Sequence, residues 1–188
     1  MRITGGIHRS RHLVAPKGSR TRPTSDRVRE ALFSILASRA ALAGADVLDL
    51  YAGTGALGLE ALSRGAREAV FVESDRAALE ALRNNVDSLG EKARTRILPG
   101  PVERCPPRVG GPFALLLCDP PYADLSNAVR VLAELAAAGA LTGGGLVVLE
   151  HASRDASPEI APLVRVDART YGDTAISIYE LSQAAPSV

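Results

Sequence analysis

One segment near the start of the chain restricts the possible folds more than any other. The apolar run Asp46–Ala52 enters a glycine-rich turn, Gly53–Gly58, and the positions from Leu57 to Leu62 then have helical spacing. A strand, a glycine turn and a helix N-terminus in this order place backbone N–H groups against a bound cofactor. Glu73 closes the next apolar run, at the position where an acid that binds a ribose is expected. The segment therefore predicts an open α/β fold with a nucleotide-containing cofactor.

Apolar runs and helically spaced segments alternate through the rest of the chain, with short glycine clusters between them. This alternation predicts a mostly parallel sheet covered on both faces, with ligands at the carboxyl ends of the strands. The last two strands are joined only by Tyr171–Thr174, which predicts an antiparallel hairpin at the end of the sheet. We expect strands at 46–51, 68–73, 95–99, 113–118, 145–150, 163–169 and 175–181, and helices at 56–64, 76–89 and 125–138.

A second motif, Asp119-Pro120-Pro121-Tyr122, directly follows the apolar run 113–118. The Asp119 carboxylate can accept a hydrogen bond from an exocyclic amine, and the Pro120 carbonyl can accept another. Tyr122 offers a ring face to a planar base, while the prolines stiffen the loop. These residue types suit the alkylation of a flat amino group. A Pro-Pro turn next to a capping acid is the structural alternative.

The two motifs together distinguish between possible cofactors. A G-x-G-x-x-G turn alone also predicts a nicotinamide-dependent dehydrogenase. Asp49, four residues before the first glycine, would repel a pyrophosphate but attract a cation. The Asp119 loop has no role in hydride transfer. Both features fit S-adenosylmethionine, which carries an ammonium and a sulfonium but no phosphate.

Charge is segregated along the chain. Residues 1–29 contain eight Lys or Arg and one acid, a net charge of +7, whereas residues 30–188 carry −6. This asymmetry indicates contact with a polyanion such as nucleic acid, and a solvated basic tail is the alternative.

The basic segment also has an apolar pattern. Ile3, Ile7, Leu13 and Val14 predict an edge hairpin pinned to the core, which would grip phosphates. We therefore expect a basic, RNA-contacting arm at 1–23 and a catalytic domain at 24–188.

A helix is expected directly after this arm. Thr24 is a suitable N-cap, and Asp26 favours the first helical turn. The N-terminal part of the helix would carry Arg27 and Arg29 on its polar side, close to whatever the arm binds.

Composition sets the broad class. A chain of 188 residues, 46% hydrophobic and 23% charged, is typical of one soluble globular protein. Cys105 and Cys118 lack metal-ligand spacing. The N-terminus lacks a signal-like apolar stretch, and no apolar run reaches the ~20 residues that span a bilayer. We expect a cytoplasmic protein with neither a metal nor a membrane anchor.

Taken together, these motifs resemble the bacterial 16S ribosomal RNA guanine-N2 methyltransferases of the RsmD type. The resemblance covers Arg2 to Leu181 and rests on Arg22–Glu30, Asp49–Gly65 and Asp119–Tyr122, the first being the most family-specific. It implies a seven-stranded, mostly parallel, Rossmann-like class I fold that uses S-adenosylmethionine, with helices on both faces and a basic N-terminal β-hairpin. It also implies methylation of the exocyclic N2 amine of one guanine in small-subunit ribosomal RNA.

The resemblance also implies site residues by position. Asp49 and Gly53–Gly55 would hold the methionine end of the cofactor, and Glu73 its ribose. Related enzymes often place an acid or Asn where this chain has Pro101, which lacks an N–H, so we expect the Val102 backbone to meet the adenine. The predicted catalytic residues are Asp119, Pro120 and Tyr122; the cofactor-binding residues are Asp49, Tyr51, Ala52, Gly53, Thr54, Gly55, Glu73, Ser74, Val102 and Asp119; the RNA-binding residues are Arg9, Arg11, Arg20, Arg22, Thr24, Arg27 and Tyr122.

Three other functions share some of these features. An adenine-N6 or cytosine-N4 methyltransferase would use the same loop, but sequence-reading DNA enzymes usually carry a separate recognition domain. A protein glutamine methyltransferase would gain nothing from a basic arm. A non-catalytic RNA-binding module would not need an intact glycine turn and acceptor loop. We therefore expect a monomeric enzyme that recognises shaped RNA in the assembled or assembling small ribosomal subunit.

Overall fold

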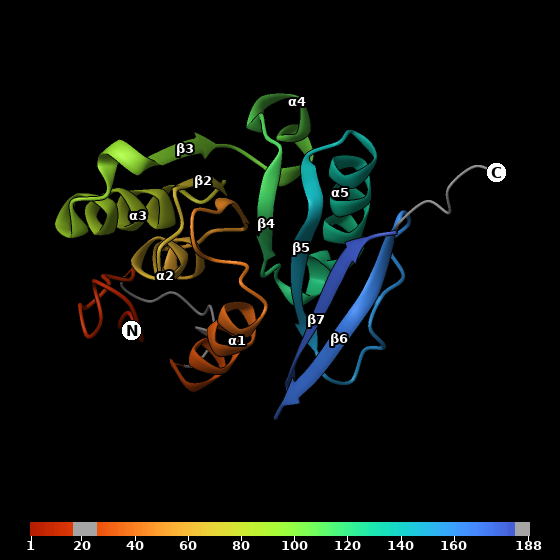
Figure 1. The fold of residues 1–188 in the computed structure, drawn as a ribbon. Helices are drawn as coiled ribbons and strands as arrows, with labels where there is room; N and C mark the ends of the chain where they lie inside the picture. Colours follow the sequence, from red (N-terminus) through yellow and green to blue (C-terminus); the bar gives the residue numbers. More distant parts are fainter. Residues whose placement is uncertain (17–25, 183–188) are drawn as a thin grey trace.

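The computed structural model describes residues 1–16 and 26–182. They form three layers, with one sheet between two groups of helices (Figure 1). The helices are α1 Asp26–Ser38, α2 Ala56–Ser63, α3 Arg76–Leu89, α4 Pro106–Val109 and α5 Leu125–Ala137, with short 3-10 helices η1 Lys92–Arg94, η2 Val102–Arg104 and η3 Tyr122–Asp124. The strands are β1 Asp46–Leu50, β2 Glu68–Glu73, β3 Thr95–Pro99, β4 Phe113–Cys118, β5 Leu141–Ala152, β6 Leu163–Tyr171 and β7 Thr174–Leu181.

Within the described residues the sheet has seven strands in the order β3-β2-β1-β4-β5-β7-β6. The strands β1 to β5 are parallel, and β7 is antiparallel to both β5 and β6. The winding of the chain reverses between β1 and β4, and ligands of such sheets bind beyond the carboxyl ends at this switch point. Leu50 pairs with both Val72 and Cys118. Tyr51, Glu73 and Asp119 therefore leave three adjacent strands at the same level.

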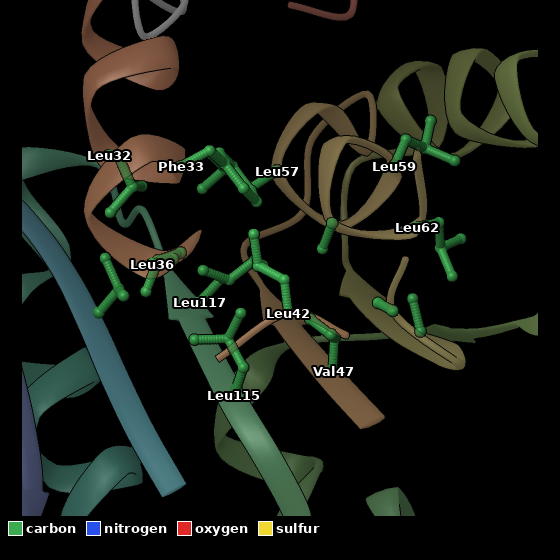
Figure 2. Close-up of a cluster of buried hydrophobic side chains, with 14 of the residues drawn as sticks. Leu32, Phe33, Leu36, Leu42, Val47, Leu57, Leu59, Leu62, Leu115 and Leu117 are labelled. Atoms are coloured by element: carbon green, nitrogen blue, oxygen red, sulfur yellow. The ribbon is translucent and has the colours of Figure 1, made fainter. Parts of the chain in front are cut away.

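Each face of the sheet packs against its own helices. Residues of α1, α2 and α3 cover one face, and residues of α4 and α5 cover the other. Figure 2 shows the first core, to which Leu36 of α1, Leu57 of α2, and Leu115 and Leu117 of β4 all contribute. Burying each such side chain contributes roughly 1.5–3 kcal/mol relative to leaving it exposed. Residues of β4 alternate between the faces, so the intervening Leu116 joins the second core.

The expected strands and longer helices occur where the sequence predicts them. The main difference is β5, which spans Leu141–Ala152 instead of 145–150, because the glycines at 143–145 continue the strand. Helix α4 was not expected, since its first residues, Pro106 and Pro107, suggest a break. Proline is nevertheless compatible with a first helical turn, where its missing N–H costs no hydrogen bond. No helix among residues 1–16 and 26–182 is long and apolar enough to cross a membrane.

The first thirteen residues turn back on themselves and lie beside α2 (Figure 1). An antiparallel bridge pairs Arg2 with His12, and the Ile3 N–H donates to the Arg11 carbonyl at 2.9 Å. Ile3 and Leu13 are buried in the core. The prediction that Ile7 and Val14 also pin this arm is wrong, because they are 75% and 58% exposed. The arm is thus held by two apolar residues and by polar contacts.

Several of those polar contacts converge on Glu60, a fully buried residue of α2. Its carboxylate accepts hydrogen bonds from the N–H groups of Thr4 and Gly5, both at 2.8 Å, and from the Thr4 hydroxyl at 2.7 Å. It also accepts from the Nε atoms of Arg29 and Arg64, at 3.3 and 2.7 Å. One buried acid thereby ties the arm, α1 and α2 together.

The partner of Glu60 on α1 corrects one expectation. Arg29 was expected on the polar side of α1, but it is fully buried. Besides Glu60, its guanidinium donates to Asp26 at 2.8 Å and to the Arg2 carbonyl. Arg29 is therefore a structural cation, and only Arg27 of this pair is exposed.

Candidate active site

Asp49 is the most deeply buried acid at the carboxyl end of β1, with 1% of its surface exposed. Its Oδ2 accepts from the Gly58 N–H at 2.8 Å, which joins the strand to the first turn of α2. Its Oδ1 is buried and has no hydrogen-bond partner among the described residues. Burial raises the pKa of Asp49 to about 8, and the nearby charges of Asp119 and Glu73 add to this effect. A buried orphan acceptor of this kind fits a cationic ligand group.

The glycine turn after β1 opens α2 as the sequence predicts. Gly55 is the N-cap residue in a left-handed conformation (φ 82°), and an added Cβ there would overlap Leu82. The Ala52 N–H donates to the Val72 carbonyl at 3.0 Å, and the Thr54 carbonyl accepts from Asn85 at 3.0 Å. These contacts fix the turn against β2 and α3. Glycine fits position 55 because it adopts the left-handed conformation without strain and has no Cβ to overlap Leu82.

Glu73 ends β2 opposite this turn. Its Oε2 accepts from the Gly53 N–H at 2.7 Å, and its Oε1 accepts from the N–H groups of Ser74 and Asp75, both at 2.7 Å. The three backbone donors fix the carboxylate while it stays half-buried. The acid is thus preorganised at the place where the sequence predicts a ribose contact.

A cavity of about 200 Å³ lies beside Glu73. Three of the predicted cofactor-binding residues, Tyr51, Ser74 and Val102, line it together with Glu73. Pro101, singled out in the sequence for its missing N–H, also lines the cavity. Sequence reasoning missed the remaining polar lining residues, which are Glu103, Asp124 and Asn127.

The missed residues lack a sequence signal of their own. Asp124 and Asn127 follow the Asp119–Tyr122 motif by a few positions, and only the fold of η3 and the start of α5 turns them toward Tyr51. Their closeness to Tyr122 in the sequence could have suggested Asp124 and Asn127 as site residues. It could not have shown that both contact Tyr51.

The acceptor loop leaves β4 next to the glycine turn. Asp119 is half-buried and Pro120 is buried. Tyr122 is 43% exposed at the start of η3, so its ring is accessible to a ligand from solvent. Asp119 is close enough to Asp49 to raise the pKa of that acid, whereas Tyr122 does not line the cavity.

The predicted RNA-binding cations are less completely placed. Arg9 and Arg27 are exposed. Arg11 is also exposed, and it donates to the Ser88 carbonyl of α3 at 2.7 Å. Arg20, Arg22 and Thr24 lie outside the described residues, as does the predicted boundary between arm and domain.

The arm is fitted closely against α2 near these cations. The Ile7 N–H donates to the Ser63 carbonyl at 2.8 Å, and the His8 N–H donates to the Ser63 hydroxyl at 2.9 Å. Gly6 has a φ of +77°, and an added Cβ would overlap the Ser63 backbone. His8 Nε2 also contacts Glu91 at 2.5 Å, across to the end of α3. The path of the arm is therefore fixed by backbone contacts as well as by Glu60.

Comparisons with known proteins agree with this geometry. The family model described as Conserved hypothetical protein 95 matches residues 1–180. "Putative rRNA methyltransferase YlbH" of Bacillus subtilis is 33% identical over 185 residues, covering 96% of this chain and 98% of that protein. Ribosomal RNA small subunit methyltransferase D of Escherichia coli is 41% identical over 122 residues, covering 65% of this chain and 60% of that protein.

Solved structures show the same fold. The Escherichia coli protein yhhF superposes with a TM-score of 0.84 at 33% identity, covering 98% of this chain and 99% of that one. A Salinibacter ruber RNA methyltransferase, solved with S-adenosyl-L-homocysteine, has a TM-score of 0.65 at 14% identity, covering 88% of this chain and 97% of that one. The second likeness concerns the fold alone.

Proposed function

Because this chain belongs to the RsmD-type family of ribosomal RNA methyltransferases, we propose that it methylates the exocyclic N2 amine of a guanine in small-subunit ribosomal RNA. The family accounts for a methyltransferase that acts on ribosomal RNA and uses S-adenosylmethionine. The choice of guanine N2 and the roles of individual residues are the proposal. One observation carries it: an orphan buried acid and an amine-accepting loop end adjacent strands at the switch point of the sheet.

The donor set fits the cofactor. The unpartnered Oδ1 of Asp49 offers an acceptor to an ammonium, and the preorganised Glu73 offers acceptors to ribose hydroxyls. The cavity between Val102 and Tyr51 would hold the adenine, with the Val102 backbone as its polar contact. When bound, S-adenosylmethionine supplies an electrophilic methyl group.

The acceptor loop would hold the target base. The Asp119 carboxylate and the Pro120 carbonyl accept hydrogen bonds from the two N–H groups of the amine. The positive charge that develops on the nitrogen is stabilised by the Asp119 anion. Tyr122, which is 43% exposed, stacks on the base once it has left its helix or loop. Positioning of the amine provides most of the rate gain.

The arm would bind the RNA backbone. Arg9, Arg11 and Arg27 are exposed cations on or beside the arm, and Arg20, Arg22 and Thr24 extend the predicted set. Phosphate contacts fix orientation without reading sequence, so the substrate would be a shaped surface of the assembled or assembling small subunit. Residues 1–23 would act as this clamp and residues 24–188 as the catalytic domain.

Nucleoside mass spectrometry of small-subunit RNA tests the proposal. RNA from cells lacking this chain should contain less N2-methylguanosine than RNA from cells that have it, and the wild-type gene should restore the difference. The variant Asp119→Ala should fail to restore it, because removing a charge-stabilising group costs on the order of hundredfold in kcat. Asp87→Ala is the matched control, since it removes an exposed acid of α3 that forms an ion pair with Lys92 at the surface.

Two outcomes would contradict the proposal. A loss of N6-methyladenosine with unchanged N2-methylguanosine would overturn the choice of base. Full restoration by Asp119→Ala would overturn the assigned role of the loop.

A further inference from the structure

Three polar side chains on the wall of the cavity form a cluster that joins two loops. The Tyr51 hydroxyl donates to Asp124 Oδ2 at 2.6 Å. Asn127 Nδ2 lies 3.3 Å from the Tyr51 hydroxyl and 3.4 Å from the same Asp124 oxygen. Tyr51 directly follows β1 and begins the glycine turn, whereas Asp124 is the last residue of η3, two positions after the Asp119–Tyr122 motif. The cluster therefore connects the cofactor turn to the base-binding loop.

The backbone of Tyr51 has an unusual conformation that accompanies this contact. Its φ of 57° lies in the left-handed region, which is strained for a residue with a Cβ. Two residues earlier, Asp49 contacts Gly58 on the α2 side of the sheet, whereas Tyr51 packs with the core on the α5 side. The unusual conformation thus accompanies a change of face that brings the ring to η3 and α5. Such strain persists only where the surroundings determine the conformation.

The direction of the hydrogen bond is also fixed. Burial, followed by the bond to Asp124, raises the pKa of Tyr51 well above its ordinary value. The hydroxyl is therefore a neutral donor, and Asp124 accepts its hydrogen bond. The Asp124 N–H in turn donates to the Pro121 carbonyl at 2.8 Å, which closes the turn that carries Tyr122. Two hydrogen bonds in sequence thus link the Tyr51 hydroxyl to the loop that carries Tyr122.

We propose that the Tyr51–Asp124 hydrogen bond is a positioning device that couples occupation of the cofactor cavity to ordering of the acceptor loop, residues 119–124. The inference rests on the function proposed above and adds a mechanism for ordered assembly. A ligand in the cavity lies against the wall that Tyr51 and Asp124 form. It stabilises their arrangement, and the loop is held ready for the base. By thermodynamic reciprocity, a bound base must strengthen cofactor binding by the same factor.

Hydrogen exchange on the intact chain tests the coupling without any RNA. Saturating S-adenosylhomocysteine should slow the exchange of wild-type peptides that cover 119–127. In Tyr51→Phe, which keeps the ring and removes only the hydroxyl, this protection should be lost while the ligand still binds. The matched control is Tyr179→Phe, which removes another buried tyrosine hydroxyl, one that donates to the Pro158 carbonyl at 2.8 Å. Tyr179→Phe should retain full protection at 119–127.

Kinetics on small subunits from cells lacking this chain provide the second readout. For Tyr51→Phe, kcat/KM for the subunit should fall about tenfold, which lies within the usual range of coupling between sites. Measured without RNA, the affinity for S-adenosylhomocysteine should change by less than about threefold, because the ring remains. Asp124→Ala, which removes the acceptor, should give a similar loss, and the double variant should lose little more than either single variant, because both remove one interaction.

The possible outcomes separate this inference from the proposed function. Equal protection of 119–127 in Tyr51→Phe and wild type would overturn the coupling, whether or not ribosomal RNA is the substrate. So would equal losses in Tyr51→Phe and Tyr179→Phe, which would indicate a general effect on stability. If the wild type methylates no small-subunit RNA, the proposed function fails, and the exchange measurement still decides whether the two loops are coupled.

Discussion

Two buried acids differ in how completely they are hydrogen-bonded: Asp49, which accepts from the first turn of α2, and Glu60, which lies on α2. Both are at most 1% exposed. Glu60 receives hydrogen bonds from the arm, α1 and α2 on both carboxylate oxygens. Asp49 receives one from Gly58 and keeps a buried oxygen without a partner among the described residues. A satisfied buried acid indicates a structural joint, whereas an incompletely satisfied one indicates a ligand site.

The difference has an energetic consequence. Removing one partner from a satisfied buried ion pair leaves the others uncompensated, which is strongly destabilising. An acid with a missing partner already carries that cost in the ligand-free protein, and the ligand relieves it. The two acids should therefore respond oppositely to substitution: Glu60 in folding, and Asp49 in binding.

The largest effect is expected at Glu60. Glu60→Ala should lower the free energy of unfolding by about 3–5 kcal/mol, because it removes the buried carboxylate that pairs with the buried Arg29 guanidinium. Denaturant titration measures this loss. The matched control is Glu134→Ala, which breaks the exposed Arg130–Glu134 pair with the same helical spacing as Glu60 and Arg64. That control should lose less than about 1 kcal/mol.

If Glu60→Ala does not fold, Glu60→Gln provides the same comparison with a smaller loss. If either variant lowers the free energy of unfolding by no more than the Glu134→Ala control does, Glu60 is not a structural joint.

The next largest effect is expected at Asp49. Asp49→Asn should weaken S-adenosylhomocysteine binding by about hundredfold, or ~2.7 kcal/mol, because the ammonium loses its anionic partner. Calorimetry measures the affinity. Asp46→Asn is the control, since Asp46 lies on the same strand but pairs with Arg67 at the surface. The comparison breaks down if Asp49→Asn unfolds the protein as readily as Glu60→Ala.

A smaller effect is expected from pH. The folded pKa of Asp49 is about 8, above its ordinary value of 3.8, so between these values the folded state binds the extra proton. The ligand-free protein should therefore lose stability as pH rises from about 4 to 8, by up to ~1.4 kcal/mol per unit. The lowered pKa values of Asp26 and Glu91 act only under more acidic conditions. Thermal unfolding across this range measures the slope, which Asp49→Asn should flatten.

Ligand binding should release the proton that Asp49 holds in the ligand-free protein. An ammonium favours the ionised acid, so S-adenosylhomocysteine affinity should rise with pH toward 8 and a proton should be released. Calorimetry in buffers with different ionisation enthalpies detects that release. Binding without proton release would mean that Asp49 is already ionised in the ligand-free protein.

The smallest effect is expected on the arm that Glu60 holds. Replacing Arg9 and Arg11 with Ala should flatten the log–log salt dependence of RNA binding by about one to two units, because fewer counterions are released. Arg130→Ala on α5 is the control and should leave the slope unchanged. An unchanged slope in the double variant would mean that these cations do not contact RNA.

Much of the fold follows from local sequence, as β1 and α2 illustrate. The apolar run at 46–50 and the glycines that follow it allow few alternatives, and Asp49 and Asp119 were predicted at the carboxyl ends of strands. The burial of Arg29 could not be predicted in this way. Its partner Glu60 lies 31 residues later, and a charge on a helix is normally solvated.

The site shows the same division. Glu73 and the acceptor loop have motif signals, because their chemistry requires particular residues at strand ends. Asp124 and Asn127 depend on where η3 and α5 place them relative to Tyr51. Contacts of that kind arise from tertiary packing, which a single sequence does not encode in any local pattern.

The close approach of Gly6 to α2 determines which arms this domain can carry. Exposed positions such as Arg9 and Ser10 can change without meeting the domain, whereas position 6 accepts only a hydrogen atom as its side chain. Docking of the arm therefore depends on Thr4, Gly5 and Gly6, which fit against Glu60 and Ser63 of α2. An arm grafted from a relative should dock if it keeps those three residues, whatever cations follow. The arm is then exchangeable, and its exposed cations can change while the residues that it packs against stay the same.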